Sequence, residues 1–373
     1  MLSKIFVVAG EASSDTHGSN LVHELYKKVK DLKFFGVCGE RMRQAGVEAV
    51  VKSSELSIMG ITEAVKRIPD VLKIIKKLKS VIQKEKPDLA VLMDFPDFNL
   101  KIAKFLKKEK IPIIYYISPQ VWAWRKSRVR EIKKYVDKML VVFPFEVDFY
   151  RKNKVNVEFI GHPVLDEIDF SEGNDENISK ETIGLFPGSR TFEIENLLPE
   201  MLKAGRIIKR HFSKVKFIIP AASTVSVDLI EKILADFKDL NVRVLKESYY
   251  EAIRSSYVVA VASGTASLEV GLFGKPMVIV YKGSFFSYLV YKMFVNVKHI
   301  GLPNILLGQK LVPELIQNDV NGENISKSLM FYLNDKEKYR KTKEKLTALR
   351  EILGSKGASK RAADIIMQFS GGV

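Results

Sequence analysis

Short apolar runs separated by glycine- and serine-rich turns recur along the chain. Each run leads through a turn into a segment whose apolar residues have helical spacing. This alternation is typical of buried parallel strands joined by crossover helices. It predicts an α/β fold with strands at residues 4–9, 34–37, 88–93, 111–117, 138–143, 158–160, 182–186, 216–220, 242–245, 257–262 and 277–281.

The pattern begins twice. Strand, Gly/Ser turn and helix open the chain at residues 4–29, with the helix expected from residue 16, and the same order returns at 182–209. Between them, FSEGNDENISKE at 170–181 is polar and acidic, as a linker would be. We therefore expect two doubly wound domains and a helical tail that packs across the domain junction, at residues 1–168, 182–335 and 336–373.

Composition bounds the class of protein. A chain of 373 residues suits two domains, and a hydrophobic content of 46% is that of a globular protein. No apolar run is long enough to span a membrane, and the apolar start runs into a Gly/Ser turn, so we interpret it as a strand rather than a signal peptide. The single cysteine, Cys38, excludes an intrachain disulfide and suits the cytoplasm, and no Cys/His cluster has metal-ligand spacing.

The net charge of +16 points to an anionic partner: nucleic acid, an anionic membrane surface or an acidic substrate. The lysines lie in amphipathic helices, notably from Val71 to Lys86, and no nucleic-acid-binding motif is present, so we expect no nucleic acid. Just before this helix, Met59 and Ile61 flank a glycine, which predicts either an apolar membrane contact above a basic face or a loop packed in the core. Abundant lysine and glutamate could instead serve thermostability.

The stretch YVVAVASGTASLEVGLFGKPMVIVY, residues 257–281, predicts a nucleotide site. We expect Ser263 and Thr265 to cap a helix beside Gly264, which lets a ligand approach the backbone. Free N–H groups and the positive end of the helix dipole then favour a phosphate. Glu269, further along the helix, could accept the hydroxyl groups of a ribose. The alternative is an ordinary capped helix with a surface glutamate.

Acidic residues follow the strands of the first half. Glu11, Asp94 and Asp97 lie past the C-terminal ends of predicted strands, where ligands gather in parallel sheets. Sugar transfer with inversion needs a general base for the acceptor hydroxyl and positive charge on the leaving diphosphate. These acids suit the first role, although each could instead cap a helix, and Arg190 at a helix start suits the second. His162 could contact a ligand or simply be a turn histidine bonded to backbone.

Two Rossmann-like domains facing each other across a cleft form the GT-B glycosyltransferase arrangement, with the donor nucleotide on the second domain and the acceptor on the first. The motifs resemble those of the lipid-A-disaccharide synthase family and follow its order. They are GEASSDTHG (10–18), IMGITEA (58–64), DFPDFN (94–99), SPQVWAWR (118–125), FIGHPVLD (159–166), FPGSR (186–190), SGTASLE (263–269) and LPNILLGQKLVPELIQ (302–317). Together they are highly specific. Ser14 stands where the family usually has glycine, which could tighten the first turn.

The resemblance implies an inverting, metal-independent transferase without a cofactor. It would join UDP-2,3-diacylglucosamine to 2,3-diacylglucosamine 1-phosphate (lipid X), releasing UDP and the β-1,6-linked lipid A disaccharide 1-phosphate. It implies Asp94 as the general base, Asp97 as the second choice and Glu11 near the acceptor. Around the UDP it implies Arg190, Ser263, Gly264, Thr265 and Glu269, with Asn304 and Gln317 lining the cleft from the donor side.

Acylated substrates reside in a bilayer, so the resemblance implies a cytoplasmic enzyme of a Gram-negative bacterium, docked peripherally on the anionic inner membrane. Met59, Ile61 and the helix from Val71 to Lys86 would supply the apolar anchor and the positive charge. The aromatic run at 285–294 could hold acyl chains, form the contact of a homodimer, or be core helix.

Two rival interpretations remain. One is another UDP-sugar enzyme of GT-B fold, such as a UDP-GlcNAc 2-epimerase or a peptidoglycan glycosyltransferase, although these lack the pair SPQVWAWR and DFPDFN. The other is a non-catalytic basic protein that binds membrane or nucleic acid, and it predicts no UDP binding.

Overall fold

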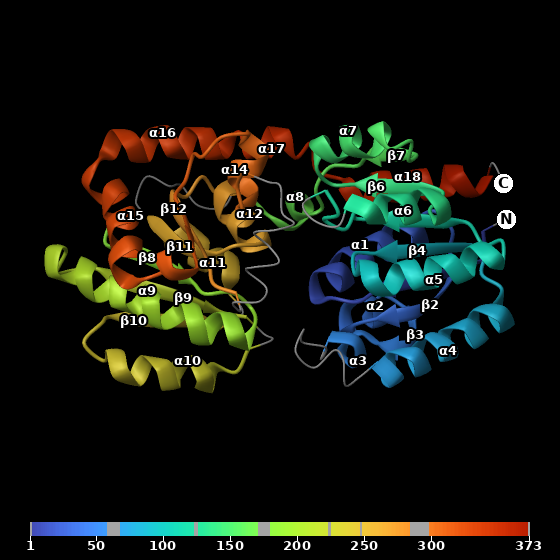
Figure 1. Cartoon of the computed structure of the whole chain (residues 1–373), viewed down its shortest axis with the longest axis horizontal. Helices are drawn as coiled ribbons and strands as arrows, with labels where there is room; N and C mark the ends of the chain where they lie inside the picture. Colours follow the sequence, from blue (N-terminus) through green and yellow to red (C-terminus); the bar gives the residue numbers. More distant parts are fainter. Residues whose placement is uncertain are drawn as a thin grey trace. The chain divides into compact units, whose positions relative to one another are not determined.

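The computed structural model describes residues 2–57, 68–122, 126–170, 180–222, 225–246, 248–283 and 298–371. The chain divides into two compact units (Figure 1). The first unit comprises Met1–Glu167 together with Leu353–Val373, and the second comprises Ile168–Ile352. Met59, Ile61, the aromatic run at 285–294 and most of the predicted linker lie outside the described residues.

The first unit is built on a parallel sheet of seven strands in the order β3-β2-β1-β4-β5-β6-β7. Since β2 and β3 lie on one side of β1 and the later strands lie on the other, the strand order reverses between β1 and β4. The strands are β1 (Lys4–Ala9), β2 (Lys33–Cys38), β3 (Glu48–Lys52), β4 (Leu89–Met93), β5 (Ile113–Tyr116), β6 (Lys138–Val141) and β7 (Val157–Phe159).

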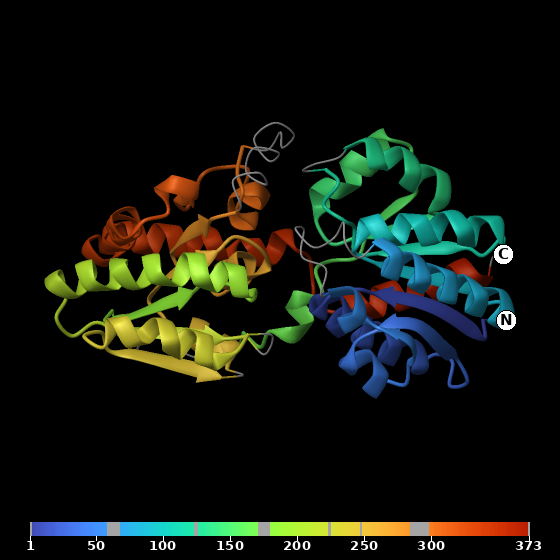
Figure 2. The same ribbon diagram turned by 60° about the horizontal axis from the view of Figure 1, so that its bottom comes forward.

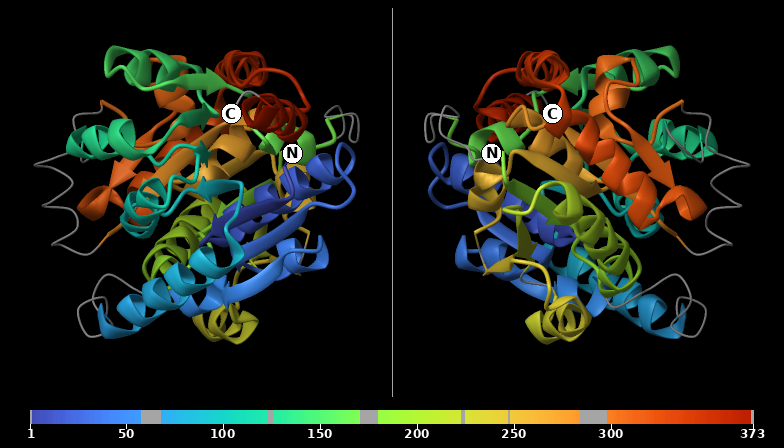
Figure 3. Two further views of the ribbon diagram at one scale, coloured as in Figure 1. Left: turned by 90° about the vertical axis from the view of Figure 1, so that its right-hand side faces the viewer. Right: turned by 90° about the vertical axis from the view of Figure 1, so that its left-hand side faces the viewer.

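Helices cover both faces of this sheet (Figure 3, left). On one face α1 (Ala12–Tyr26) packs against α2 (Glu40–Gln44) and α18 (Ala358–Gly371). On the other, α5 (Pro96–Lys108) packs against α4 (Ile68–Glu85) and α6 (Val129–Tyr135), and their apolar residues form one buried cluster with those of the strands. The remaining helices are α3 (Ser53–Ser57), η1 (Lys126–Arg128), α7 (Pro144–Lys152) and α8 (Val164–Glu167).

The second unit repeats this plan with six parallel strands in the order β10-β9-β8-β11-β12-β13. Its strand order reverses between β8 and β11. The strands are β8 (Thr182–Phe186), β9 (Lys216–Ala221), β10 (Val242–Lys246), β11 (Val258–Ala262), β12 (Met277–Tyr281) and β13 (Glu314–Ile316).

In the second unit α9 (Thr191–His211) packs against α10 (Val227–Leu234) and α15 (Gly322–Asn334) (Figure 2). A separate group forms where α12 (Thr265–Leu272) contacts α14 (Leu302–Leu307), α16 (Lys336–Thr347) and α17 (Leu349–Ile352). The remaining helices are η3 (Ala235–Phe237), α11 (Tyr249–Ser255) and η4 (Gln317–Asp319).

The predicted α/β fold with two parallel sheets is confirmed, and every predicted strand is present. Two strands were missed, β3 and β13, because they are short or polar and lie at sheet edges, where burial does not impose an apolar run. The predicted start of the first helix was wrong. The helix begins at Ala12 instead of residue 16, because Glu11 takes the extended N-cap conformation and the Ala-Ser-Ser-Asp run joins the first turn.

The C-terminal segment is divided between the units: α16 and α17 belong to the second and α18 to the first. The helices of this segment are interrupted at Gly354 and Gly357, whose φ values of 88° and 94° lie in the left-handed region. The predicted domain limits and the packing of the tail across the junction stay predictions. Within the described residues, no helix has the length and apolar character needed to cross a membrane.

Candidate active site

Both sheets bring two loops together where their strand order reverses. Ligands of open parallel sheets bind at this place, outside the carboxyl ends of the strands. In the first unit Glu11 follows β1 and Asp94 follows β4. In the second unit Arg190 lies in the turn after β8, and Gly264 lies in the turn after β11. The predicted acids and the predicted phosphate-binding residues thus occupy corresponding positions in the two units.

Asp94 lies in a strained turn. Asp94 and Phe95 have φ values of 46° and 43°, in the left-handed region, where each non-glycine residue costs on the order of 1–3 kcal/mol. Neighbouring side chains hold the turn in place: the buried Asn99 Nδ2 donates hydrogen bonds to the carbonyl oxygens of Met93 (3.0 Å) and Asp94 (2.7 Å). The hydroxyl of the fully buried Tyr115 also donates to the Asp94 carbonyl.

We expect Asn99→Ala to lower the free energy of unfolding by about 2–4 kcal/mol, because it removes the fully buried amide that donates to both the Met93 and the Asp94 carbonyl groups and so loosens a strained turn. Urea unfolding measures the change. Asn153→Ala is the matched control, since its Nδ2 makes one exposed bond to the Phe149 carbonyl (2.8 Å), and it should cost about 1 kcal/mol or less. Equal small losses in both variants would show that Asn99 does not hold the turn.

The surroundings of the Asp94 carboxyl group oppose its negative charge. Burial and the neighbouring Glu11 carboxylate raise the pKa of Asp94 to about 6, against the opposing effects of a backbone hydrogen bond from Phe95 and the charge of His17. A base is most effective when its pKa lies close to the operating pH. Burial and Glu11 thus move the pKa of Asp94 toward the range that suits a general base.

Asp97 has different surroundings. It lies in the first turn of α5, its side chain is 70% exposed, and it forms an ion pair with Arg128. A carboxylate in a first turn stabilises the helix through the dipole. This gives Asp97 a structural role and favours Asp94 between the two acids.

No side chain caps the amino end of α12. The predicted caps, Ser263 and Thr265, were wrong: Gly264 is the N-cap and no side chain caps the helix. The Ser263 hydroxyl donates instead to the carbonyl oxygen of Ile300 (3.1 Å), which comes from a segment distant in the sequence. Gly264 has φ 147° and ψ −160°, a conformation confined to glycine. Its backbone conformation, and not a lack of space, requires glycine here, because a Cβ would meet nothing within 4 Å. An exposed helix end without a side-chain cap suits a phosphate.

Arg190 is the N-cap residue of α9, and its side chain is 73% exposed. Glu193 accepts hydrogen bonds from the backbone N–H groups of Ser189 (3.0 Å) and Arg190 (3.3 Å), so this carboxylate caps the helix. Burial raises the pKa of Tyr281 at the end of β12; Glu193 adds to the rise and Arg190 opposes it. Arg190 and Glu193, after β8, are therefore close enough to Tyr281 for their charges to act on its hydroxyl group.

Glu269 lies on α12 beside two tyrosines that the sequence analysis missed. The Tyr250 hydroxyl donates to Glu269 Oε1 (3.3 Å). Burial, together with the Glu269 carboxylate, raises the pKa of Tyr249 well above its usual value. Both tyrosines follow β10, and paired tyrosines at a strand–helix turn were the signal that could have identified them.

Asn304 and Gln317 bond to backbone. The fully buried Asn304 donates to the Val312 carbonyl (2.9 Å) and to Glu314 Oε1 (2.9 Å), and accepts from the Val312 N–H (3.1 Å). Gln317, with φ 56°, accepts from the Gly283 N–H (2.6 Å) and donates to the Gly283 carbonyl (3.1 Å). These bonds fasten the segments around α14 and β13. Direct contact of either amide with a nucleotide stays a prediction.

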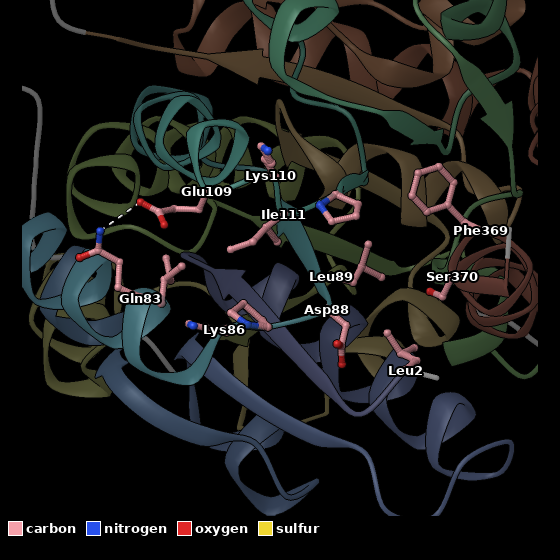
Figure 4. A pocket seen from close by; sticks show the side chains of 13 residues that line it. Leu2, Gln83, Lys86, Asp88, Leu89, Glu109, Lys110, Ile111, Phe369 and Ser370 are labelled. Carbon is pink, nitrogen blue, oxygen red and sulfur yellow. Dashed lines mark hydrogen bonds between the residues drawn. The ribbon is translucent and has the colours of Figure 1, made fainter. Parts of the chain in front are cut away.

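A cavity of about 560 Å³ opens at the opposite edge of the first sheet (Figure 4). Its lining includes Leu2, Asp88 and Ile111, which precede β1, β4 and β5, and Gln83 donates to Glu109 (3.0 Å) beside it. Because it lies at the amino ends of the strands, this cavity is separate from the loops that carry Glu11 and Asp94. In the part of the chain that the structure describes, no group of His, Cys, Asp or Glu residues could hold a metal ion.

The comparison with known families decides the identity. The model of the lipid-A-disaccharide synthetase family matches residues 5–369. The chain belongs to this family. Lipid-A-disaccharide synthases of Geobacter metallireducens and Syntrophus aciditrophicus are 42% and 40% identical to it, over 99% and 96% of this chain and 97% and 96% of theirs. The resemblance carried by the motifs is confirmed, and the protein is a glycosyltransferase.

Solved structures support the fold predicted for a lipid-A-disaccharide synthase. The UDP-GlcNAc 2-epimerase of Neisseria meningitidis bound to UDP-GlcNAc is similar with a TM-score of 0.62 at 14% identity, covering 98% of this chain and 100% of that one. A calicheamicin glycosyltransferase is similar with a TM-score of 0.63 at 13% identity, covering 100% and 99%. The GT-B fold class is confirmed. Neither rival function gains support, because structural similarity to an epimerase at 14% sequence identity shows a shared fold only.

Proposed function

We propose that the protein condenses UDP-2,3-diacylglucosamine with 2,3-diacylglucosamine 1-phosphate (lipid X). The acceptor hydroxyl attacks the anomeric carbon of the donor, Asp94 takes the hydroxyl proton, and UDP leaves from the opposite face. The product is the β-1,6-linked lipid A disaccharide 1-phosphate. The family match over residues 5–369 carries the reaction. Asp94 is supported as the base by its strained turn at the point where the first sheet reverses its strand order, where burial and Glu11 raise its pKa to about 6.

On the donor side, the diphosphate is proposed to bind the amino end of α12 and the guanidinium of Arg190. The backbone conformation of Gly264 and the absence of a side-chain cap support this, since both leave N–H groups for an anion. Glu269 is proposed to accept the ribose hydroxyls, with Tyr249 and Tyr250 keeping its carboxylate in position. Ser263 and Thr265 flank this site, and Asn304 and Gln317 hold the segments beside it.

The assay supplies both acylated substrates to the purified protein in the presence of EDTA, and follows UDP release and product mass. We expect equimolar UDP and disaccharide 1-phosphate, with a β linkage by NMR. An α linkage would exclude the in-line displacement assisted by Asp94. Hydrolysis of the donor without a disaccharide would exclude lipid X as the acceptor.

The acid limb of the pH–rate profile should report the ionisation of Asp94. A base acts when deprotonated, so kcat/KM should be level above the pKa of about 6 and fall roughly tenfold per pH unit below it. Initial rates between about pH 4.5 and 8 measure this. A limb near the ordinary aspartate value of about 3.9 would contradict the assignment of a raised pKa.

We also propose that the protein attaches peripherally to the cytoplasmic face of an anionic inner membrane. The described part of the predicted contact, α4, supports this, because Ile75, Leu78 and Ile82 are buried whereas its outer side is basic. That outer side carries exposed Lys73, Lys76, Lys77 and Lys84, and Leu72 at 55% exposure. The homodimer expected from the sequence is kept as a proposal as well.

Removing two of these charges should weaken membrane binding. Lys73→Gln with Lys76→Gln should lower partitioning onto vesicles containing anionic phospholipid by roughly 30-fold, because each lysine near such a surface contributes about 1 kcal/mol. The control, Lys327→Gln with Lys336→Gln, removes the same charge from the second unit. Vesicle co-sedimentation at low salt measures both, and equal weakening would show that only net charge matters.

A further inference from the structure

The segment after β5 carries the motif SPQVWAWR, and its described part is residues 118–122. Because β5 pairs with β4 up to the last residue of each strand, the segment leaves the sheet beside Asp94. The Tyr115 hydroxyl donates to the Asp94 carbonyl, and beyond the segment Arg128 forms an ion pair with Asp97. The chain on either side of the segment is therefore tied to the Asp94 turn and to the helix that follows it.

The segment itself is fastened to α7 through Glu146, whose side chain is buried. Oε1 of Glu146 accepts a hydrogen bond from the Trp122 indole Nε1 (3.1 Å), and Oε2 accepts one from the Phe143 N–H (3.1 Å) at the start of the helix. One turn later, the hydroxyl groups of Tyr150 and Ser118 share a hydrogen bond (2.7 Å). Two side chains on one face of α7 thus hold the segment.

Ring contacts fix the orientation of the indole. The Trp122 ring packs edge-on against Phe145, with centroids 4.7 Å apart, and Phe145 stacks on Phe143 at 5.6 Å. Phe143 also contacts the ring of His162 at 5.2 Å. His162 Nδ1 accepts a hydrogen bond from the Val164 N–H (3.2 Å), so His162 is a turn histidine bonded to backbone.

Capping α7 does not by itself require a buried carboxyl group. Asp335 caps α16 with a carboxylate at the surface, which accepts two backbone hydrogen bonds of 3.0 Å. Burial raises the pKa of Glu146 to about 8, whereas hydrogen bonds from Trp122 and from neighbouring N–H and hydroxyl groups lower it. A carboxyl group that is costly to bury persists when its donors need it. The contact with Trp122 accounts for its place in the interior.

We propose that Glu146 is a positioning residue that acts through the Trp122 indole and holds residues 118–122 in the shape that receives lipid X beside Asp94. The proposal rests on the proposed function, in which Asp94 takes the proton of the hydroxyl of lipid X. Without this hold, ordering the segment would cost free energy each time lipid X binds. The donor, proposed to bind the second unit, would bind as before.

The test compares the KM values of the two substrates. Glu146→Ala should raise the KM for lipid X roughly tenfold, because the indole N–H loses its buried partner, and should leave the KM for the UDP-sugar and the affinity for UDP unchanged. Glu146→Gln keeps an oxygen for the indole but turns its NH₂ toward the Phe143 N–H, so its KM for lipid X should rise less. Trp122→Phe keeps a ring and removes the N–H, and should also raise the KM for lipid X alone. These two variants carry the test if Glu146→Ala does not fold.

Fluorescence gives a second measurement. In a Trp124→Phe background Trp122 is the only tryptophan, and its emission should move to longer wavelength in Glu146→Ala as water reaches the ring. Asp335→Ala is the matched control, because it removes a helix-capping carboxylate far along the chain from the segment, and both KM values should stay at the wild-type level. An unchanged KM for lipid X in the folded variants, equal rises for both substrates, or the same rise in Asp335→Ala would overturn the proposal. A wild-type protein that forms no disaccharide would instead overturn the proposed function, so the two failures are distinguishable.

Discussion

Replacing Asp94 by asparagine is expected to lower kcat by about 10²–10⁴-fold, the contribution of a positioned general base. Asparagine keeps the size and the tolerance of left-handed φ that this turn requires, so the fold should be unaffected. Glu11 would face a neutral amide instead of a second carboxyl group, which removes a repulsion and should slightly stabilise the protein. Turnover under saturating substrates measures the loss.

Asp97→Asn is the control for this prediction. It removes another carboxyl group three residues along, but one that is exposed and paired with Arg128, so kcat should fall less than about tenfold. UDP affinity by calorimetry should match the wild type in both variants. A larger loss in Asp97→Asn than in Asp94→Asn would transfer the role of base to Asp97.

The apolar pattern was sufficient to locate the strand ends after which the proposed site residues lie. Buried parallel strands must be apolar over their whole length, so β1, β4, β8 and β11 stand out in the sequence, and polar residues directly after them lie at the ligand-binding edge. Which strands are neighbours is a tertiary property that the apolar pattern does not encode. The structure adds that Glu11 and Asp94 share one reversal of strand order, and Arg190 and Gly264 share the other.

The supporting contacts could not be predicted from local patterns. Glu167 and His17 are 150 residues apart in the sequence, and yet His17 Nδ1 lies 3.1 Å from Glu167 Oε1 in the fold. The resemblance alone placed Asn304 beside the cleft, and the structure adds that it is buried, with its amide bonded to the Val312 backbone and to Glu314. The Ser263 cap failed for a similar reason: its acceptor, the Ile300 carbonyl, comes from a distant segment.

Backbone strain gives an independent sign of where function is located. Seven non-glycine residues of the described chain have positive φ. Lys86, Lys110 and Lys154 lie just past helix ends, where a left-handed residue is an ordinary stop. The other four follow strand ends, namely Asp94, Phe95, Ile117 and Gln317. Strain of this kind persists only when neighbours enforce it, and it clusters at sites that hold ligands.

Arg190→Ala should weaken UDP binding by roughly 10–100-fold, because a hydrogen bond to a charged group contributes about 1.5–3 kcal/mol. The exposed Arg190 guanidinium follows β8. We expect kcat to fall as well, because a cation beside the leaving diphosphate stabilises the negative charge that develops in the transition state. Arg190→Lys should recover part of the affinity, because it keeps the charge and loses the planar fork. Calorimetry with UDP measures both variants.

Loss of the Arg190 side chain should leave the fold intact, because Glu193 caps α9 through backbone N–H groups that alanine also provides. Arg243→Ala on the edge strand β10 is the control: its side chain is similarly exposed, at 69%, and its nearest carboxylate is 3.9 Å away. UDP affinity should not change there. Equal affinities for the wild type and Arg190→Ala would place the diphosphate away from the end of β8, leaving the α12 terminus as its only proposed site.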